Sequence, residues 1–261
     1  MLSDPQRQEA RRFMKDAVSN RDVSTTVQLT RSLLAGGKPV DVVFCASALN
    51  ELAAETIEQF GAKRLKTYVV RSVTVEPILP SITVEAVLSN YVLDLQVGGY
   101  GSYVDELLNP QSALAQFHPD AVFILLDLEE IAGHLPDLCA AGKTAEVQQE
   151  IEDCASRITQ LLINFRSTNS ARIVFQGGVV PDLTSLGDIG DANLPFSLPN
   201  AVQLLNQKLA ALCRTLSDCI FFHVDHLAAR HGRARWRDTR MFLASRLAVS
   251  ADAFGIYASG L

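Results

Sequence analysis

The sequence predicts an α/β protein: a three-layer αβα domain with a five-stranded parallel sheet, preceded by an N-terminal helical extension. Two observations support this prediction. Five apolar runs of strand length alternate with helical segments after residue 61, and such alternation is typical of a parallel sheet covered by helices on both faces. Before that point the chain shows only helical patterns. We therefore divide the chain into a helical extension, residues 1–60, and an α/β domain, residues 61–261.

Three helices are expected in the extension. The first two, 4–18 and 22–37, begin with a capping aspartate, and Gly36 and Gly37 are expected to end the second one. The third, 47–61, has an approximate apolar face and ends at a glycine.

The predicted strands are short apolar runs at 67–72, 91–97, 120–128, 171–177 and 219–225. Helical segments separate them at about 76–90, 102–115, 143–166 and 197–216. Ligands of parallel sheets sit beyond the carboxyl ends of the strands, so the polar residues after each strand are the site candidates. The loop at 177–195 is rich in Gly, Pro and Asp, and its length is typical of a functional or mobile loop.

The composition excludes several classes of function. The chain has 261 residues, 48% of them apolar, and a net charge of -6, so it has neither the basic footprint of a nucleic-acid-binding protein nor a polybasic membrane patch. It has no apolar stretch of membrane-spanning length and no secretory signal. Its five cysteines are widely spaced and never cluster with histidines at zinc spacing. We therefore expect reduced thiols, a cytoplasmic location, and no metal or other cofactor.

Ser72 and Thr74 follow the first predicted strand, just before Glu76 and Pro77. Either hydroxyl could cap the next helix, because a Ser or Thr oxygen accepts a backbone N–H there and proline is favoured in the first turn. A serine at a strand-to-helix turn could equally be a nucleophile if a base activates it. The local sequence leaves both interpretations open.

Gly98 and Gly99 follow the second predicted strand. They could bring backbone N–H groups close to a ligand, or only permit a tight turn. After the third strand, Asp127 and Glu129 could begin an acidic helix that the helix dipole favours. An Asp-x-Asp phosphatase motif of the haloacid dehalogenase type is disfavoured, because Glu129 stands at its second position.

The fifth strand runs into a cluster of histidines, His223, His226 and His231. Of these, His226 is the candidate base, although surface or half-buried histidines are the commoner interpretation. The next segment carries Arg233, Arg235 and Arg237 around the sole tryptophan, Trp236. These residues, Arg235 and Trp236 above all, could contact a phosphate or a partner's acidic surface, or form a solvated basic turn.

Several ordered segments between about residues 65 and 255 resemble the N-terminal domain of FkbH-like proteins. Among them are "VGGYGSYVDELL", "FILLDLEEI" and "VDHLAARHGRARWRDTRMFLASRLAVS". That family joins an SGNH-hydrolase-like domain to a haloacid dehalogenase-like domain, so the resemblance implies a flavodoxin-like or SGNH-hydrolase-like sheet. It also implies a family activity, the loading of a glyceryl unit from a glycolytic phosphoglycerate onto an acyl carrier protein in polyketide-type biosynthesis.

The resemblance is incomplete. The sequence contains no Asp-x-Asp-x-Thr or Asp-x-Asp-x-Val motif of the dehalogenase half. We therefore do not expect the glyceryl-loading chemistry of this chain, which would be an excised domain or a free-standing relative.

The resemblance also implies roles for single residues. Ser72 stands where the SGNH nucleophile belongs, and Gly98 or Gly99 where an oxyanion-donating glycine belongs. Asp127 stands near the place of an asparagine. An asparagine side chain donates N–H to an oxyanion, whereas an ionised aspartate only accepts hydrogen bonds and repels the developing charge.

The last SGNH motif, Asp-x-x-His, should fall near 245–250, where Ser245 and Ala248 stand in place of the acid and the base. Loss of a general base costs orders of magnitude in rate, unless one of the three histidines after the fifth strand replaces it.

We therefore expect a domain with degenerate catalytic motifs that binds an acyl carrier protein, its acyl group or a dehalogenase-like partner domain. Ligand contacts are expected from Thr74, Gly98, Gly99 and Asp127. The alternative is an active acyltransferase or esterase that uses Ser72 as its nucleophile on an acyl ester or thioester.

Overall fold

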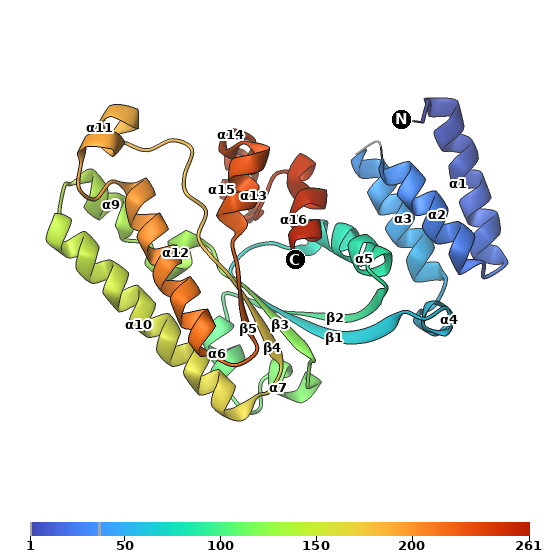
Figure 1. Cartoon of the computed structure of the whole chain (residues 1–261), viewed down its shortest axis with the longest axis horizontal. Helices are drawn as coiled ribbons and strands as arrows, with labels where there is room; N and C mark the ends of the chain where they lie inside the picture. The colour runs from blue at the N-terminus through green and yellow to red at the C-terminus, as the bar shows by residue number, and fades with distance from the viewer. Residues whose placement is uncertain (1, 36–37) are drawn as a thin grey trace.

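A parallel sheet forms the centre of the molecule. The computed structural model describes residues 2–35 and 38–261, and in these ranges it has five strands in the order β2-β1-β3-β4-β5 (Figure 1). The strands are β1 (Lys63–Arg71), β2 (Tyr91–Tyr100), β3 (Ala121–Leu125), β4 (Arg172–Gln176) and β5 (Cys219–Phe222). All neighbouring pairs are parallel. The predicted α/β fold class and the N-terminal helical region are both confirmed.

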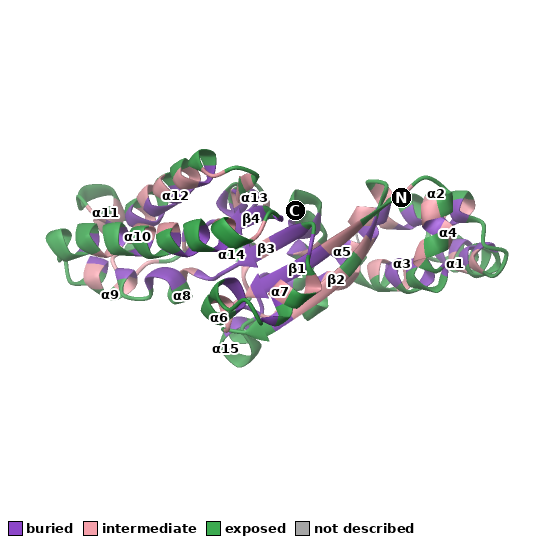
Figure 2. Cartoon of the chain, turned by 90° about the horizontal axis from the view of Figure 1, so that it is seen from below, coloured by how far each residue is buried: buried purple, intermediate pink, exposed green. Residues whose placement is uncertain are grey.

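The two faces of the sheet bury separate hydrophobic cores. Successive side chains of a strand point to opposite faces, and in β1 Tyr68 and Val70 contribute to one core while Val69 contributes to the other. The central strands β3 and β4 are largely buried (Figure 2). Burial on both faces explains why the predicted strands are nearly continuous apolar runs.

Helices cover both faces of the sheet. Those on the first core are α6 (Tyr103–Leu108), α7 (Ala113–Phe117), α8 (Leu128–Ala132), α9 (Leu135–Ala140), α10 (Thr144–Thr168) and α12 (Leu198–Thr215). Those on the second are η1 (Glu76–Ile78), α5 (Leu79–Leu88), α13 (Val224–His231), α14 (Arg233–Trp236), η2 (Ala251–Ala253) and α16 (Phe254–Gly260). The remaining helices of this part are α11 (Gly187–Asn193) and α15 (Thr239–Ser245).

Several predicted elements differ from the structure, among them the strand at 219–225, whose last two residues belong to α13. The single helix predicted at 47–61 is wrong: α3 (Pro39–Glu51) begins earlier, and Ala53, with a φ of 56°, separates it from α4 (Ala54–Gln59). The helix predicted at 102–115 is divided into α6 and α7, because a proline follows Asn109 and disfavours helical geometry there. The long loop before α12 contains α11.

The N-terminal helices α1 (Asp4–Ser19), α2 (Val23–Leu34) and α3 share a third core. Met14, Leu33 and Leu49 are buried in it together with Val84 of α5 and Val92 of β2. The helical region therefore packs against the edge of the α/β part, at one end of the molecule (Figure 1).

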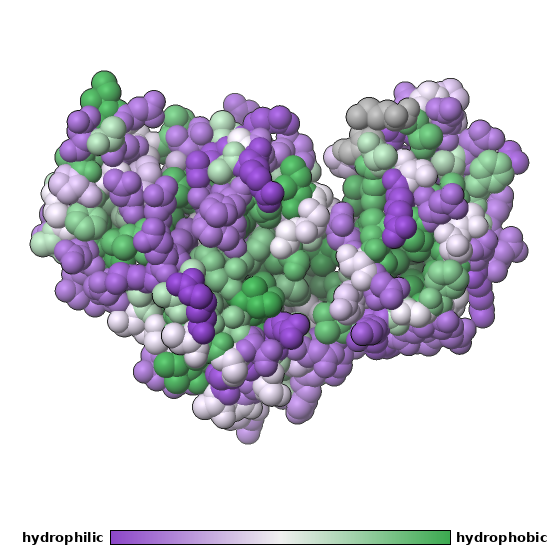
Figure 3. All heavy atoms as spheres, viewed as in Figure 1, coloured by the Kyte–Doolittle hydropathy of each residue, from purple (hydrophilic) through white to green (hydrophobic). Residues whose placement is uncertain are grey.

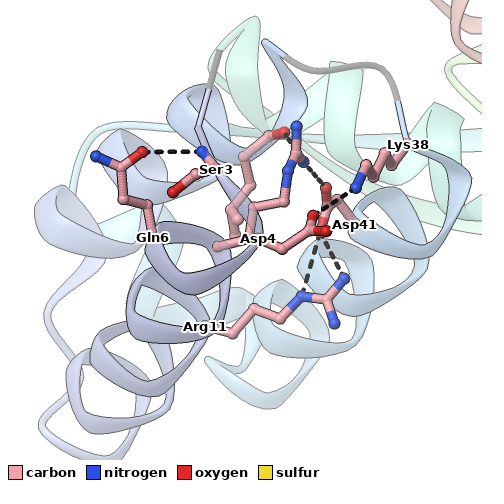
Figure 4. A network of polar contacts seen from close by, with 8 residues as sticks. Ser3, Asp4, Gln6, Arg11, Lys38 and Asp41 are labelled. Carbon is pink, nitrogen blue, oxygen red and sulfur yellow. Dashed lines mark hydrogen bonds and ion pairs between the residues drawn. The ribbon is translucent and has the colours of Figure 1, made fainter.

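Asp41 of α3 connects α3 with α1 through ion pairs. Its carboxylate is fully buried and accepts hydrogen bonds from Arg7 and Arg11 of α1, the latter at 2.6 Å (Figure 4). Gly36 and Gly37, predicted to end α2, lie outside the described residues. The boundary between the helical extension and the α/β domain stays a prediction.

Every helix in the described part of the chain is too short or too polar to cross a membrane.

Candidate functional site

The strand order reverses between β1 and β3, because β2 lies on one side of β1 and the later strands on the other. In open parallel sheets the crevice beyond the carboxyl ends at such a reversal is the usual ligand site. Ser72 follows β1 and Asp127 follows β3, so the two residues meet at this switch point. The backbone N–H of Asp127 donates to Ser72 Oγ at 2.8 Å, and the N–H of Ser72 donates to the carbonyl of Leu125 at 3.1 Å.

Ser72 is enclosed rather than presented to solvent. It is only 4% exposed, and its hydroxyl oxygen is occupied by the Asp127 N–H. Among the described residues no histidine hydrogen-bonds to it. Ser72 is also not the cap of the next helix, since Val75 precedes η1 and Ile78 precedes α5. The proposed capping role is therefore wrong for Ser72.

Thr74 is not a helix cap either. Its N–H donates to the Arg246 carbonyl at 2.8 Å, and its hydroxyl donates to the Ser245 carbonyl. These two hydrogen bonds connect the residues after β1 with the end of α15 and the segment that follows it. That segment carries Ala248, buried against the crevice where the resemblance places a base.

Asp127 is held by several contacts. Its carboxylate caps α8 by accepting the N–H of Glu129 at 3.3 Å and forms an ion pair with Arg237. The Arg237 guanidinium in turn lies over the ring of Phe242, 4.1 Å from its centre. The side chains of Asp127 and Arg237 are 9% and 30% exposed. Asp127 stands where the resemblance places an asparagine. Its carboxylate is paired with an arginine of the same chain.

Gly98 and Gly99 lie inside β2 and are explained by close packing. A Cβ at Gly98 would lie 2.9 Å from a ring carbon of Tyr68, and one at Gly99 would lie 2.6 Å from the Ser102 hydroxyl. The carbonyl of Gly98 accepts a hydrogen bond from Arg71 at 3.1 Å. These contacts explain the presence of glycine at both positions, without a role for either glycine in binding an oxyanion.

The histidines lie elsewhere. The rings of His223 and His226 stack with centroids 3.6 Å apart and line a separate cavity of about 310 Å³ beside α12. His223 follows β5, whereas Ser72 follows β1. Because β3 and β4 lie between these two strands, β5 is roughly 14 Å from β1 at the usual distance between strands. His231 lies 3.9 Å from Asp252 and beside Trp236. The structure thus does not bring His226, the candidate base, together with Ser72.

A cavity of about 330 Å³ opens at the switch point beside Asp127. Its walls include apolar residues such as Leu128, Val179 and Leu198, the largely buried Trp236, and the two arginines Arg233 and Arg237. Of the predicted partner-contact residues, Trp236 is therefore at the site.

Arg235 is not among the residues that line this cavity and pairs with Asp252 at 2.9 Å. Arg233 and Arg237, which surround Trp236 in the sequence together with Arg235, do line the cavity. Arg233 binds the buried Asp225 through two hydrogen bonds, of 3.1 and 2.8 Å. Three alternating arginines were visible in the sequence, but their spacing alone does not reveal which of them turns inward.

The cysteines do not line this cavity, and four of them are buried. Burial raises the pKa of Cys45, Cys139 and Cys154 to about 11, so these thiols stay protonated at neutral pH. Within residues 2–35 and 38–261 no group of three or more His, Cys, Asp or Glu side chains is placed to hold a metal ion.

No protein-family model and no curated protein matches the sequence. Among solved structures, the N-terminal part of the protein BF1531 from Bacteroides fragilis, which contains a phosphatase domain and was complexed with Mg, superposes with a TM-score of 0.61 at 17% identity. The match covers 77% of this chain and 51% of that one, so this chain spans about half the length of that structure.

The acetyl xylan esterase AlAXEase gives a TM-score of 0.42 at 9% identity, over 75% of this chain and 97% of that one, which is too low to indicate a shared fold. The chain therefore shares its α/β fold with about half of the N-terminal part of BF1531.

Proposed function

We propose that this chain is a binding domain that holds the acylated arm of a carrier protein at the switch point without cleaving it. One observation carries the proposal: the Ser72 hydroxyl is a buried hydrogen-bond acceptor, and the Asp127 carboxylate is paired with Arg237. A nucleophilic serine needs a base, and an oxyanion needs hydrogen-bond donors. The crevice offers Ala248 and a carboxylate where those groups belong.

The cavity suits such an arm. Its volume of about 330 Å³ lies within the range of ligand sites, about 300–1,000 Å³. Leu128, Val179 and Leu198 supply apolar walls for an acyl chain. The N–H groups of Arg233 and Arg237 that are not bonded to Asp225 and Asp127 supply donors for the amide carbonyls or phosphate of a pantetheine arm. The resemblance to FkbH-like proteins motivates the carrier protein as partner, and a dehalogenase-like domain as a second partner.

The proposal is tested by adding the unlabelled domain to a ¹⁵N-labelled type II acyl carrier protein in its apo, holo and acetylated forms. We expect chemical-shift changes in the holo and acetylated carriers that exceed those of the apo form.

A matched pair of variants localises the contact. Leu183 lines the cavity and is 86% exposed, while Ile189 of α11 is 81% exposed and does not line it. Leu183→Glu is expected to weaken binding at least tenfold, and Ile189→Glu to leave it unchanged. The absence of shifts with every carrier, or equal losses in the two variants, would contradict the proposal.

The alternative function, acyl transfer or ester hydrolysis by Ser72, rests on its place at the carboxyl end of β1. Turnover of short p-nitrophenyl esters that is lost in Ser72→Ala would favour this alternative.

A further inference from the structure

A second concave surface lies between the N-terminal helices and the α/β part, apart from the switch point. This groove has a volume of about 590 Å³ and is formed by α3, α5 and the segment of η2 and α16. Figure 3 shows hydrophobic surface bordering the hollow between the N-terminal helices and the rest of the chain. Its walls are mainly apolar and include Val42, Val43, Pro80, Val84, Phe254 and Ile256. Binding sites for small molecules are typically apolar clefts of this size with few polar groups.

The polar groups of the groove are Ser81, Glu85 and Asp252. Asp252 is paired with Arg235 at 2.9 Å. Ser81 and Glu85 lie one turn apart on α5, so both face the groove. Across residues 2–35 and 38–261, no lysine, arginine or histidine forms an ion pair with Glu85, and none lines the groove.

Glu85 is half-buried, and its carboxyl group has no hydrogen-bond partner among the described side chains and backbone groups. Burial raises its pKa, with no neighbouring charge to offset the effect. A carboxylate in an apolar wall is costly without a counter-charge. The groove therefore has an apolar body and one uncompensated negative group.

We propose that this groove binds a small apolar molecule carrying an ammonium group, with the ammonium on the Glu85 carboxylate and the apolar body against α3 and α16. We infer an ammonium group because its positive charge complements the negative charge of Glu85. A carboxylate ligand would bring two negative charges together, and an alcohol would leave Glu85 without a counter-charge. The site does not involve Ser72 or Asp127, so it stands independently of carrier binding.

The test compares decylamine, decanol and decanoate by isothermal titration calorimetry at pH 7.5, below their micelle-forming concentrations. Decylamine is expected to bind about tenfold tighter than decanol, equivalent to about 1.4 kcal/mol, and decanoate is expected to bind weakest. Glu85→Gln should reduce decylamine binding to the level of decanol and change decanol binding by less than about twofold. Glu146→Gln, which removes an exposed carboxylate on α10, should leave decylamine binding unchanged.

A second variant blocks the groove itself. Gly255 lines the groove, and a Cβ there would meet no atom within 4 Å, so Gly255→Phe places a ring in open space without a clash at its Cβ. All three probes are expected to bind at least tenfold more weakly to it. The proposal is overturned if decylamine does not bind, if Glu85→Gln binds it as tightly as the parent does, or if Gly255→Phe leaves the affinities unchanged.

Discussion

Replacing Arg237 by alanine is expected to destabilise the protein by about 2 kcal/mol. Removing one partner of a fully buried ion pair costs about 3–5 kcal/mol, because the other charge is left buried and unpaired. An exposed pair contributes about 0–1 kcal/mol. The Asp127 side chain is 9% exposed and that of Arg237 is 30% exposed, so this pair lies between the two limits.

Two further contacts adjust this value in opposite directions. Asp127 still accepts the backbone N–H of Glu129 after the change, which lowers the cost. Loss of the guanidinium from the face of Phe242 raises it by about 0.5–1 kcal/mol. The net expectation therefore stays near 2 kcal/mol.

Urea unfolding, followed by circular dichroism and by the fluorescence of the sole tryptophan, measures this change. Arg240→Ala is the matched control, because Arg240 lies three residues further along the chain, on α15, is exposed and forms no ion pair within the described residues. Asp127→Asn and the double variant complete a cycle, from which we expect a coupling of about 1–2 kcal/mol. Equal urea midpoints for Arg237→Ala and Arg240→Ala, or zero coupling, would refute the expectation that the ion pair between Asp127 and Arg237 stabilises the protein.

Three further changes test other parts of the structure by urea unfolding. Asp41→Asn should cost about 3 kcal/mol, because it leaves the Arg7 charge buried with a neutral partner, and a loss below about 1 kcal/mol would contradict this. Tyr257→Phe should cost about 1–2 kcal/mol by removing the donor to buried Gln176, so parental stability would argue against that bond. Burial and a neighbouring histidine lower the pKa of His223. The unfolded chain then binds this proton first, so stability should fall as the pH drops below about 6.5. His223→Gln should flatten this slope, and an unchanged slope would contradict the assignment.

The sheet could be predicted from the sequence because its strands are buried on both faces. Apolar runs such as the one at 121–125 have few other interpretations once helices flank them. The meeting of Ser72 and Asp127 also follows from topology, since residues after neighbouring parallel strands share one edge.

The partners of the arginines could not be predicted, because each depends on a carboxylate whose position only the fold determines. Arg237 reaches Asp127, which lies 110 residues earlier in the chain. Arg233 and Arg235 instead turn to aspartates on α13 and η2. The break between α3 and α4 could not be predicted either. Ala53 adopts a positive φ there, and a glycine usually marks such a position in a sequence.

The central claim is that Ser72 is a buried hydrogen-bond acceptor and not a nucleophile. Intact-protein mass spectrometry after incubation with a fluorophosphonate measures this most directly, with a known serine hydrolase as the positive control. We predict no adduct on this chain under conditions that label the control completely. An adduct that maps to Ser72 and disappears in Ser72→Ala would contradict the claim.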